Sequence, residues 1–86
     1  MTCRIDRVLI EQGVVLRISG RITGEDLDVL RTALEEGRVV ALDLTEVELV
    51  DRDAVKLLAR TETNGTELRH CPAYIREWIT RERGRS

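Results

Sequence analysis

The segment from Arg38 to Leu44, with the sequence RVVALDL, constrains the fold more than any other part of the chain. It is short and nearly continuously apolar, which is typical of a strand covered on both faces in a partly parallel sheet. From Asp53 the spacing changes, and apolar residues recur at helical intervals until Asn64-Gly65, a pair that ends helices. A buried strand followed by an amphipathic helix predicts an α/β fold in which this strand is central.

Two runs rich in strand-forming residues precede that segment. CRIDRVLI (3–10) and GVVLRISG (13–20) are connected through Glu11-Gln12-Gly13. In the second run, Val14, Leu16 and Ile18 alternate with Val15, Arg17 and Ser19, so one set points to each face of a strand. Runs of this length and spacing predict an antiparallel hairpin with a short loop that contains glycine.

A helix is predicted from Gly24 to Glu36. Thr23 stands three positions before Asp26, which is the spacing of a capping box, so the threonine hydroxyl is expected to satisfy a free helix N–H. Gly37 follows the last helical position, where a left-handed terminus favours glycine. The apolar residues that share one face are Leu27, Leu30, Ala33 and Leu34.

The last third of the chain repeats the strand and helix order. TELRHC (66–71) is a weaker strand, and Pro72 suits the first turn of a final helix. The apolar face of that helix consists of Tyr74, Ile75, Trp78 and Ile79. Because strand-helix-strand units favour parallel neighbours, the sequence predicts one α/β domain over residues 1–86, with a single mixed sheet of about four strands and about three helices packed on it.

Composition excludes several classes of function. Lys and Arg number 14 against 16 Asp and Glu, and this net charge of −2 argues against nucleic-acid binding. The locally basic tail, 81–86, is expected to be solvated. The N-terminus carries charges where a signal peptide would be apolar, and no segment reaches the ~20 apolar residues of a membrane span. The sequence therefore predicts a cytoplasmic protein with no membrane insertion.

The two cysteines are expected to remain thiols. Cys3 and Cys71 lie far apart in the sequence, and a reducing compartment disfavours disulfides. His70 and Cys71 are adjacent, so in a strand they would point to opposite faces. No metal site and no cofactor are therefore predicted, although Gly20 and Gly24 leave close approach of a nucleotide open.

Three stretches together resemble a known family. VVLRISGRI (14–22), VVALDLTEVELVDRDAVKLLA (39–59) and NGTELRHCPAYIREWI (64–79), with a helix between the first two, look like the STAS domain, the fold of bacterial anti-sigma factor antagonists. In that family the junction after the hydrophobic strand reads hydrophobic-D-S-S-G-L. Here it reads Val50 to Val55, which keeps the hydrophobic frame and Asp51 but lacks the serines and the glycine.

The resemblance gives the junction a specific meaning. In the family, a partner kinase that is itself an anti-sigma factor phosphorylates the second serine, and this serine falls on Asp53. A carboxylate cannot accept a phosphoryl group, so the resemblance implies a member that is not switched at this position. Asp53 would imitate the modified state only in part, because a phosphate carries about −1.5 to −2 charges. Thr45 and Ser19 remain open as other modification sites.

The candidate partner-binding residues are Thr45, Asp51, Arg52, Asp53 and Ala54. Two readings of them stay open. Aspartate is among the best helix N-caps, worth about 1 kcal/mol, so Asp51 or Asp53 can be present for capping alone. Arg52 is either a solvated loop residue or a partner contact, since arginine is enriched in interface hot spots.

The leading hypothesis is a non-catalytic protein-interaction module. The resemblance implies a protein partner of the anti-sigma factor or histidine-kinase-like ATPase type, and a homodimer is a further possibility. The alternative is a STAS-type subunit of a bacterial lipid or solute ABC transporter. Enzymatic activity is not expected, because the acid pair Asp51 and Asp53 is accompanied by a single histidine and no phosphate-binding loop.

Overall fold

The computed structural model describes residues 3–84 and contains one mixed sheet. β1 (Cys3–Ile10) pairs antiparallel with β2 (Gly13–Ile22), and β3 (Val39–Val50) and β4 (Glu67–Arg69) follow in parallel, so the strand order is β1-β2-β3-β4. The predicted fold class is confirmed: an α/β fold with a four-stranded mixed sheet that begins with an antiparallel hairpin. β3 is one of the two inner strands, as expected of the apolar run.

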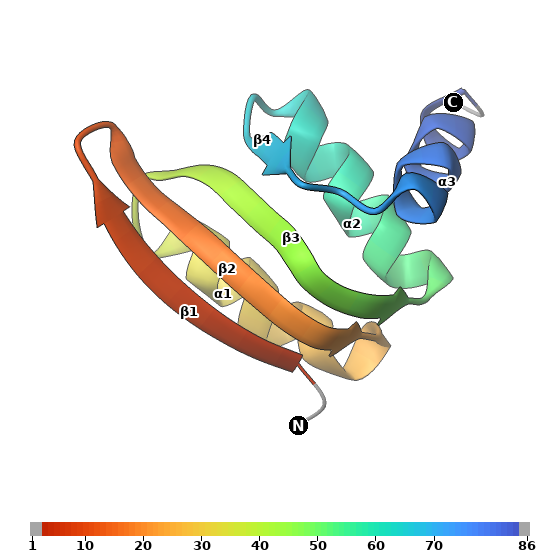
Figure 1. Ribbon diagram of the computed structural model, residues 1–86, viewed down its shortest axis with the longest axis horizontal. Coiled ribbons are helices and arrows are strands. Elements are labelled where there is room, and N and C mark those ends of the chain that lie inside the picture. Colours follow the sequence, from red (N-terminus) through yellow and green to blue (C-terminus); the bar gives the residue numbers. More distant parts are fainter. Residues whose placement is uncertain (1–2, 85–86) are drawn as a thin grey trace.

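Helices fill the connections between the parallel strands. A 3-10 turn, η1 (Gly24–Asp26), leads into α1 (Leu27–Glu35), α2 (Arg52–Thr63) joins β3 to β4, and α3 (Ala73–Arg83) follows β4. Figure 1 shows α1 behind the sheet, and α2 and α3 side by side near β4. The helix predicted from Gly24 thus starts as a 3-10 turn, a common geometry at helix N-termini.

The core lies between the sheet and the helices. Its largest fully buried side chains come from every layer, and include Leu16, Ile18, Leu42 and Leu44 from the sheet, Leu30 and Leu58 from α1 and α2, and Ile75 and Ile79 from α3. At about 25 cal/mol per Å² of apolar surface removed from water, burial of these side chains is the main stabilising term. It holds α1 behind the sheet and packs α3 against α2.

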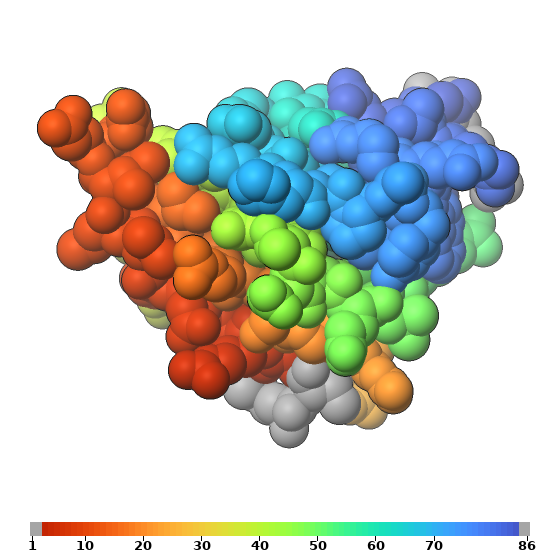
Figure 2. Space-filling model, in the orientation of Figure 1, coloured from red at the N-terminus to blue at the C-terminus, as the bar shows by residue number. Residues whose placement is uncertain are grey.

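The opposite face of the sheet carries no helix in the part of the chain that the structure describes (Figures 1 and 2). The first half of β3 is nevertheless covered on both faces, as predicted, because the adjacent Ala41 and Leu42 point to opposite faces and neither has exposed surface. The central row of the opposite face has alternating charge, because Asp6 pairs in register with Arg17, Arg17 with Asp43, and Asp43 with Arg69. Burial raises the pKa of the Asp43 carboxyl, but two hydrogen bonds from Thr45 and the charges of His70 and Arg17 outweigh it and hold the pKa below its ordinary value.

β3 is longer than the sequence predicted. Residues 45–50 continue the strand instead of forming a connection, and they pair with the end of β2. The register shifts between Arg17 and Ser19 and again between Gly20 and Arg21, which places bulges in this half of the sheet. Because of the bulges, buried residues recur at every third position in residues 44–50, and the alternation that identifies a strand is lost.

The predicted capping box at the start of η1 is present: the Thr23 side chain faces the Asp26 backbone N–H, and the Asp26 side chain accepts from the Thr23 backbone N–H. The Asp26 carboxylate accepts hydrogen bonds from the Thr23 backbone N–H and from the Thr23 hydroxyl, both at 3.1 Å. Asp26 is buried and closes the turn. This arrangement fixes the path of the chain from β2 into α1.

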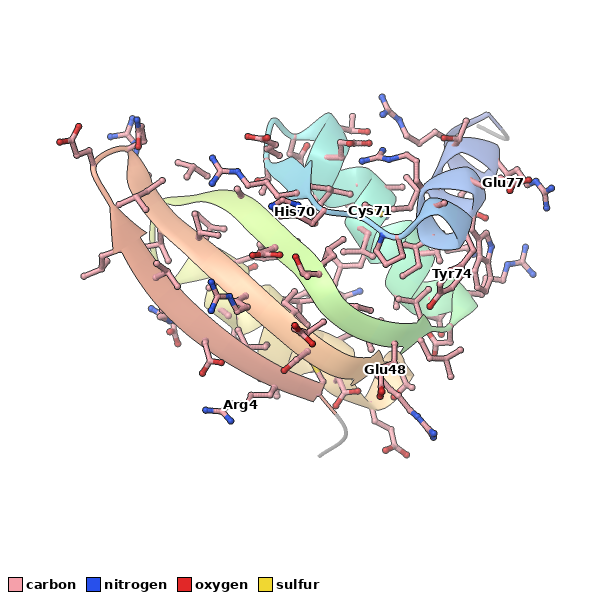
Figure 3. The ribbon with its side chains drawn as sticks, viewed as in Figure 1. Arg4, Glu48, His70, Cys71, Tyr74 and Glu77 are labelled. Atoms are coloured by element: carbon pink, nitrogen blue, oxygen red, sulfur yellow. The ribbon has the colours of Figure 1, made fainter. Side chains whose placement is uncertain are left out.

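α3 is held by its polar side chains as well as by its apolar face. Ile75 and Ile79 are fully buried, but Tyr74 is 48% exposed and Trp78 is half-buried, so only part of the predicted apolar face lies in the core. The Tyr74 hydroxyl donates to the Glu48 carbonyl of β3 at 2.5 Å, where β3 extends beyond its pairing with β4 (Figure 3). Tyr74 thus satisfies a carbonyl on an edge of β3 that lies beyond its pairing with β4.

Candidate docking site at the strand-to-helix junction

The junction lies where the carboxyl ends of two parallel strands meet. β2 ends at Ile22 and β3 at Val50, and these two residues pair in register. Each strand passes directly into a helical turn, η1 after β2 and α2 after β3, so two helix starts lie together at one end of the sheet (Figure 1).

Asp51 joins these two helix starts. Its Oδ1 accepts the Ala54 N–H at 2.8 Å, which caps α2, and its Oδ2 accepts the Gly24 N–H at 2.7 Å, at the start of η1. Its backbone N–H donates to the Ile22 carbonyl at 3.2 Å. One residue therefore connects the end of β2, the start of η1 and the start of α2, and the capping interpretation is confirmed for Asp51. We call Ile22, Gly24, Asp51 and Ala54 the junction anchor.

Arg52 and Asp53 occupy the other side of the same turn. Both side chains are exposed, and within residues 3–84 neither makes a hydrogen bond or an ion pair. Asp53 lies in the first turn of α2, where the helix dipole favours a negative charge. Because capping is performed by Asp51, it does not account for Asp53.

The other two candidate residues are placed differently. Ala54 has no exposed surface, so its part in the junction is to donate its N–H to Asp51 and pack in the core. Thr45 lies within β3 instead of in a connection, and its hydroxyl donates to the Asp43 carboxylate at 2.6 Å. Five residues of extended strand, 46–50, lie between Thr45 and Asp51, and the six residue steps span roughly 20 Å. The structure therefore brings Asp51, Arg52 and Asp53 together and leaves Thr45 outside the junction.

A shallow hollow lies beside Arg52 and was missed by the sequence interpretation. It is lined by Arg52 from α2 and by Trp78, Arg81 and Glu82 from α3. Trp78 was assigned to the apolar face of the last helix, but the side chain is only half-buried and borders this hollow. The packing of α2 against α3 creates the hollow, and no local sequence pattern contains that information. We call Arg52, Asp53, Trp78 and Arg81 the presented face.

Glu62 fixes α3 against α2 and therefore positions the presented face. Its Oε1 accepts hydrogen bonds from Arg76 and from Arg83, both at 2.9 Å. The hydrogen bond from Arg76, opposed by burial and helped by both arginine charges, holds the pKa of the Glu62 carboxyl below its ordinary value. The same bond raises the pKa of Arg76. The link is thus an ionic one throughout the neutral range.

The described residues do not group the usual metal ligands together. Among residues 3–84, no three His, Cys, Asp or Glu side chains are grouped so that they could hold a metal ion. Cys3 and Cys71 are free thiols, and burial raises the pKa of both, which disfavours the reactive thiolate. His70 and Cys71 lie on the connection between β4 and α3 (Figure 3). Asp51 and Asp53 belong to the start of α2, in a different part of the chain.

Comparison with known proteins adds no assignment: no protein-family model matches the chain, and no curated protein matches its sequence. In the described part of the chain, none of the helices has the length and apolar character needed to cross a membrane.

Proposed function

We propose that this chain is a non-catalytic protein-interaction module of the STAS type, which binds its partner through Arg52 and Asp53 at the start of α2. The observation that carries the proposal is that neighbouring residues of the junction have different roles. Asp51 is fully engaged in holding the turn, while the two residues that follow are exposed and have no partner within residues 3–84.

A rigid turn favours binding because little conformational freedom is lost when the partner docks. The junction anchor fixes the backbone of residues 51–54 through two hydrogen bonds to a carboxylate. Adjacent side chains of opposite charge orient a partner with complementary charges, and arginine and tryptophan are both enriched in interface hot spots. The exposed Arg52 and the half-buried Trp78 border the same hollow.

The resemblance to the STAS domain supplies the class of partner. The order of strands and helices is the one on which the resemblance rests, and the position of the family's phosphorylated serine falls on Asp53 in the first turn of α2. The proposed partner is therefore a cytoplasmic anti-sigma factor or histidine-kinase-like ATPase. Since a carboxylate cannot be phosphorylated, binding to that partner would not be switched at this position.

An affinity capture from lysate of the source organism, with mass-spectrometric readout, tests the proposal. Wild type is compared with Arg52→Glu and Asp53→Ser, and Arg31→Glu serves as the matched control because it reverses an exposed charge on α1. We expect wild type and the control to enrich an ATPase of the kinase type or an anti-sigma protein. Both junction variants should recover a smaller amount of that partner.

Two other outcomes would count against the proposal. Enrichment of a transport ATPase would favour the ABC-transporter subunit instead. Recovery of every partner at wild-type levels by Arg52→Glu and Asp53→Ser would show that the presented face is a solvated surface, and the binding site would have to lie elsewhere.

A further inference from the structure

The outer edge of β1 is the second surface with an unusual arrangement. The Val14 N–H donates to the Arg38 carbonyl, 2.8 Å away, just before β3, so the polar backbone groups of Val14 point away from β1. Leu9, directly opposite, is therefore in a non-hydrogen-bonded pair, and its own N–H and carbonyl point outward. The alternation of an antiparallel ladder gives the same direction to Arg7, Ile5 and Cys3.

This edge is long and open. β1 has eight residues and pairs on one side only, with β2, in the part of the chain described here (Figure 1). A row of outward N–H and carbonyl groups of this length is a template for another strand. The opposite edge of the sheet differs, because β4 has only three residues.

We propose that a second copy of the chain pairs with this edge, β1 against β1 in antiparallel orientation about a two-fold axis, with Ile5 opposite Ile5 of the second copy. A two-fold pairing of identical strands is isologous, so each contact occurs twice. The proposal concerns a different surface from the presented face and does not rest on the proposed docking function.

The charges on β1 select this register. With Ile5 opposite Ile5, Arg4 of each copy lies opposite Asp6 of the other, which forms two reciprocal ion pairs on the open face of the sheet. Moving the two-fold axis by one residue towards the N-terminus places Arg4 opposite Arg4 of the second copy. Moving it by one residue towards the C-terminus places Asp6 opposite Asp6, and moving it by two places Arg7 opposite Arg7. Charged edge strands commonly resist pairing, but here one register turns the same charges into attraction.

Arg4 is free to make this contact. Its side chain is largely exposed and extends beyond the outer side of β1, away from the rest of the molecule (Figure 3). Among residues 3–84 it contacts the Asp6 carboxylate, with Nε 3.3 Å from Oδ2, and both side chains are exposed. Solvent weakens an exposed ion pair, so little free energy is lost when the pair within each chain is replaced by the two Arg4–Asp6 pairs between the copies.

An apolar hollow runs beside the same edge on the helix side. It is lined by Cys3, Ile5, Asp26 and Val29, and it continues along α1 towards Arg7 and Glu36, which form an ion pair. Val29 is 46% exposed and faces solvent next to Ile5. The two-fold axis would bring the Ile5 side chains of both copies together over the two hollows and cover apolar surface in each.

Sedimentation equilibrium of the purified chain over a range of concentrations tests the pairing. Five paired residues on each strand make a small interface, so the dimer is expected to be weak and to depend on concentration. The weight-average mass of wild type should rise from the monomer value, 9.8 kDa, towards twice that value. A wild-type mass that stays at the monomer value at all concentrations would overturn the proposal.

Two proline variants locate the interface. Ile5→Pro removes an outward N–H and no bond to β2, so it should abolish the rise in mass while the fold is kept. Leu9→Pro is the matched control, because its N–H also points outward but lies beyond the paired residues, and it should dimerise like wild type. A dimer that survives in Ile5→Pro, or is lost in Leu9→Pro, would contradict the register.

A charge variant provides a second test should Ile5→Pro fail to fold by circular dichroism. Arg4→Glu places a glutamate opposite Asp6 of the second copy, and within the chain Arg4 lies opposite the uncharged Ser19. We expect the dissociation constant to increase at least tenfold. An unchanged constant in a folded Arg4→Glu variant would overturn the proposed pairing.

Discussion

Asp51 and Asp53 carry the same carboxylate two residues apart, yet they belong to two regions with different roles. Asp51 is half-buried and accepts N–H groups from Gly24 and Ala54, so it is part of the junction anchor. Asp53 is exposed and has no hydrogen-bond partner within residues 3–84. Backbone N–H donors lie within reach of Asp51, and none in the described part of the chain bonds to Asp53. The position of these donors therefore decides whether an acidic residue stabilises the fold or is available to a partner, and the residue type does not.

The largest effect is expected at the anchor. Asp51→Ala leaves the N–H groups of two helix starts without their acceptor, and because each bond is to a charged group, we expect the free energy of unfolding to fall by about 2–4 kcal/mol. Urea denaturation followed by the fluorescence of Trp78, the single tryptophan, measures it. Asp51→Ser is the matched variant, because serine can cap α2 but is too short to reach Gly24 as well, and it should lose less.

The next largest effect on the free energy of unfolding is expected at the ionic link between α2 and α3, and this effect depends on pH. Glu62→Gln weakens the bonds from Arg76 and Arg83, and we expect a loss of about 1–2 kcal/mol at pH 7. Because the folded pKa of Glu62 lies below its ordinary value, 4.5, its contribution is complete above that value and is lost as the pH falls through the folded pKa.

Unfolding free energies at neutral and acidic pH test the pH dependence. Wild type should lose stability on acidification, and Glu62→Gln should lose less, with Asp43 accounting for part of the remaining dependence because its pKa is also lowered. Equal slopes for wild type and Glu62→Gln would contradict the assignment of the link to an ionised Glu62.

A smaller effect is expected at the contact between α3 and β3. Tyr74→Phe keeps the half-exposed ring but removes the hydroxyl that donates to the Glu48 carbonyl, so we expect a loss of about 1 kcal/mol, from the same urea measurement. A neutral result would mean that water replaces the hydroxyl at this edge.

The smallest effects on stability should come from the presented face. Arg52→Glu and Asp53→Ser change exposed side chains that have no partner within residues 3–84, and the unfolding free energy should change by no more than about 0.5 kcal/mol. If either variant approached the loss of Asp51→Ala, the distinction between the two regions would be wrong.

Much of the fold could be predicted because its signals are local. The hairpin, the helix after Thr23 and the helix predicted from Asp53, observed as α2 (Arg52–Thr63), each follow from spacing and end signals within a few residues. The second half of β3 could not be predicted, because its bulges follow from pairing with β2 and erase the alternation of apolar residues.

The site could be predicted only in part for a related reason. The sequence placed Asp51 and Asp53 at a helix start, but both are good caps, and the choice depends on Gly24, which is 27 residues from Asp51. Trp78 and Arg81 come beside Arg52 only because α3 packs on α2. Contacts between distant segments decided both points, and a reading of local patterns does not contain them.

Site-specific photo-crosslinking tests the central claim most directly. A photoreactive phenylalanine analogue is placed at position 56, which is exposed on α2 one turn after Arg52 and leaves Arg52 and Asp53 intact, or at position 31 on α1 as control, and the chain is irradiated in lysate of the source organism. The account predicts that the ATPase or anti-sigma protein captured by wild type is crosslinked from position 56 and not from position 31. Crosslinking of that partner from position 31 alone, or equally from both positions, would contradict docking at the start of α2.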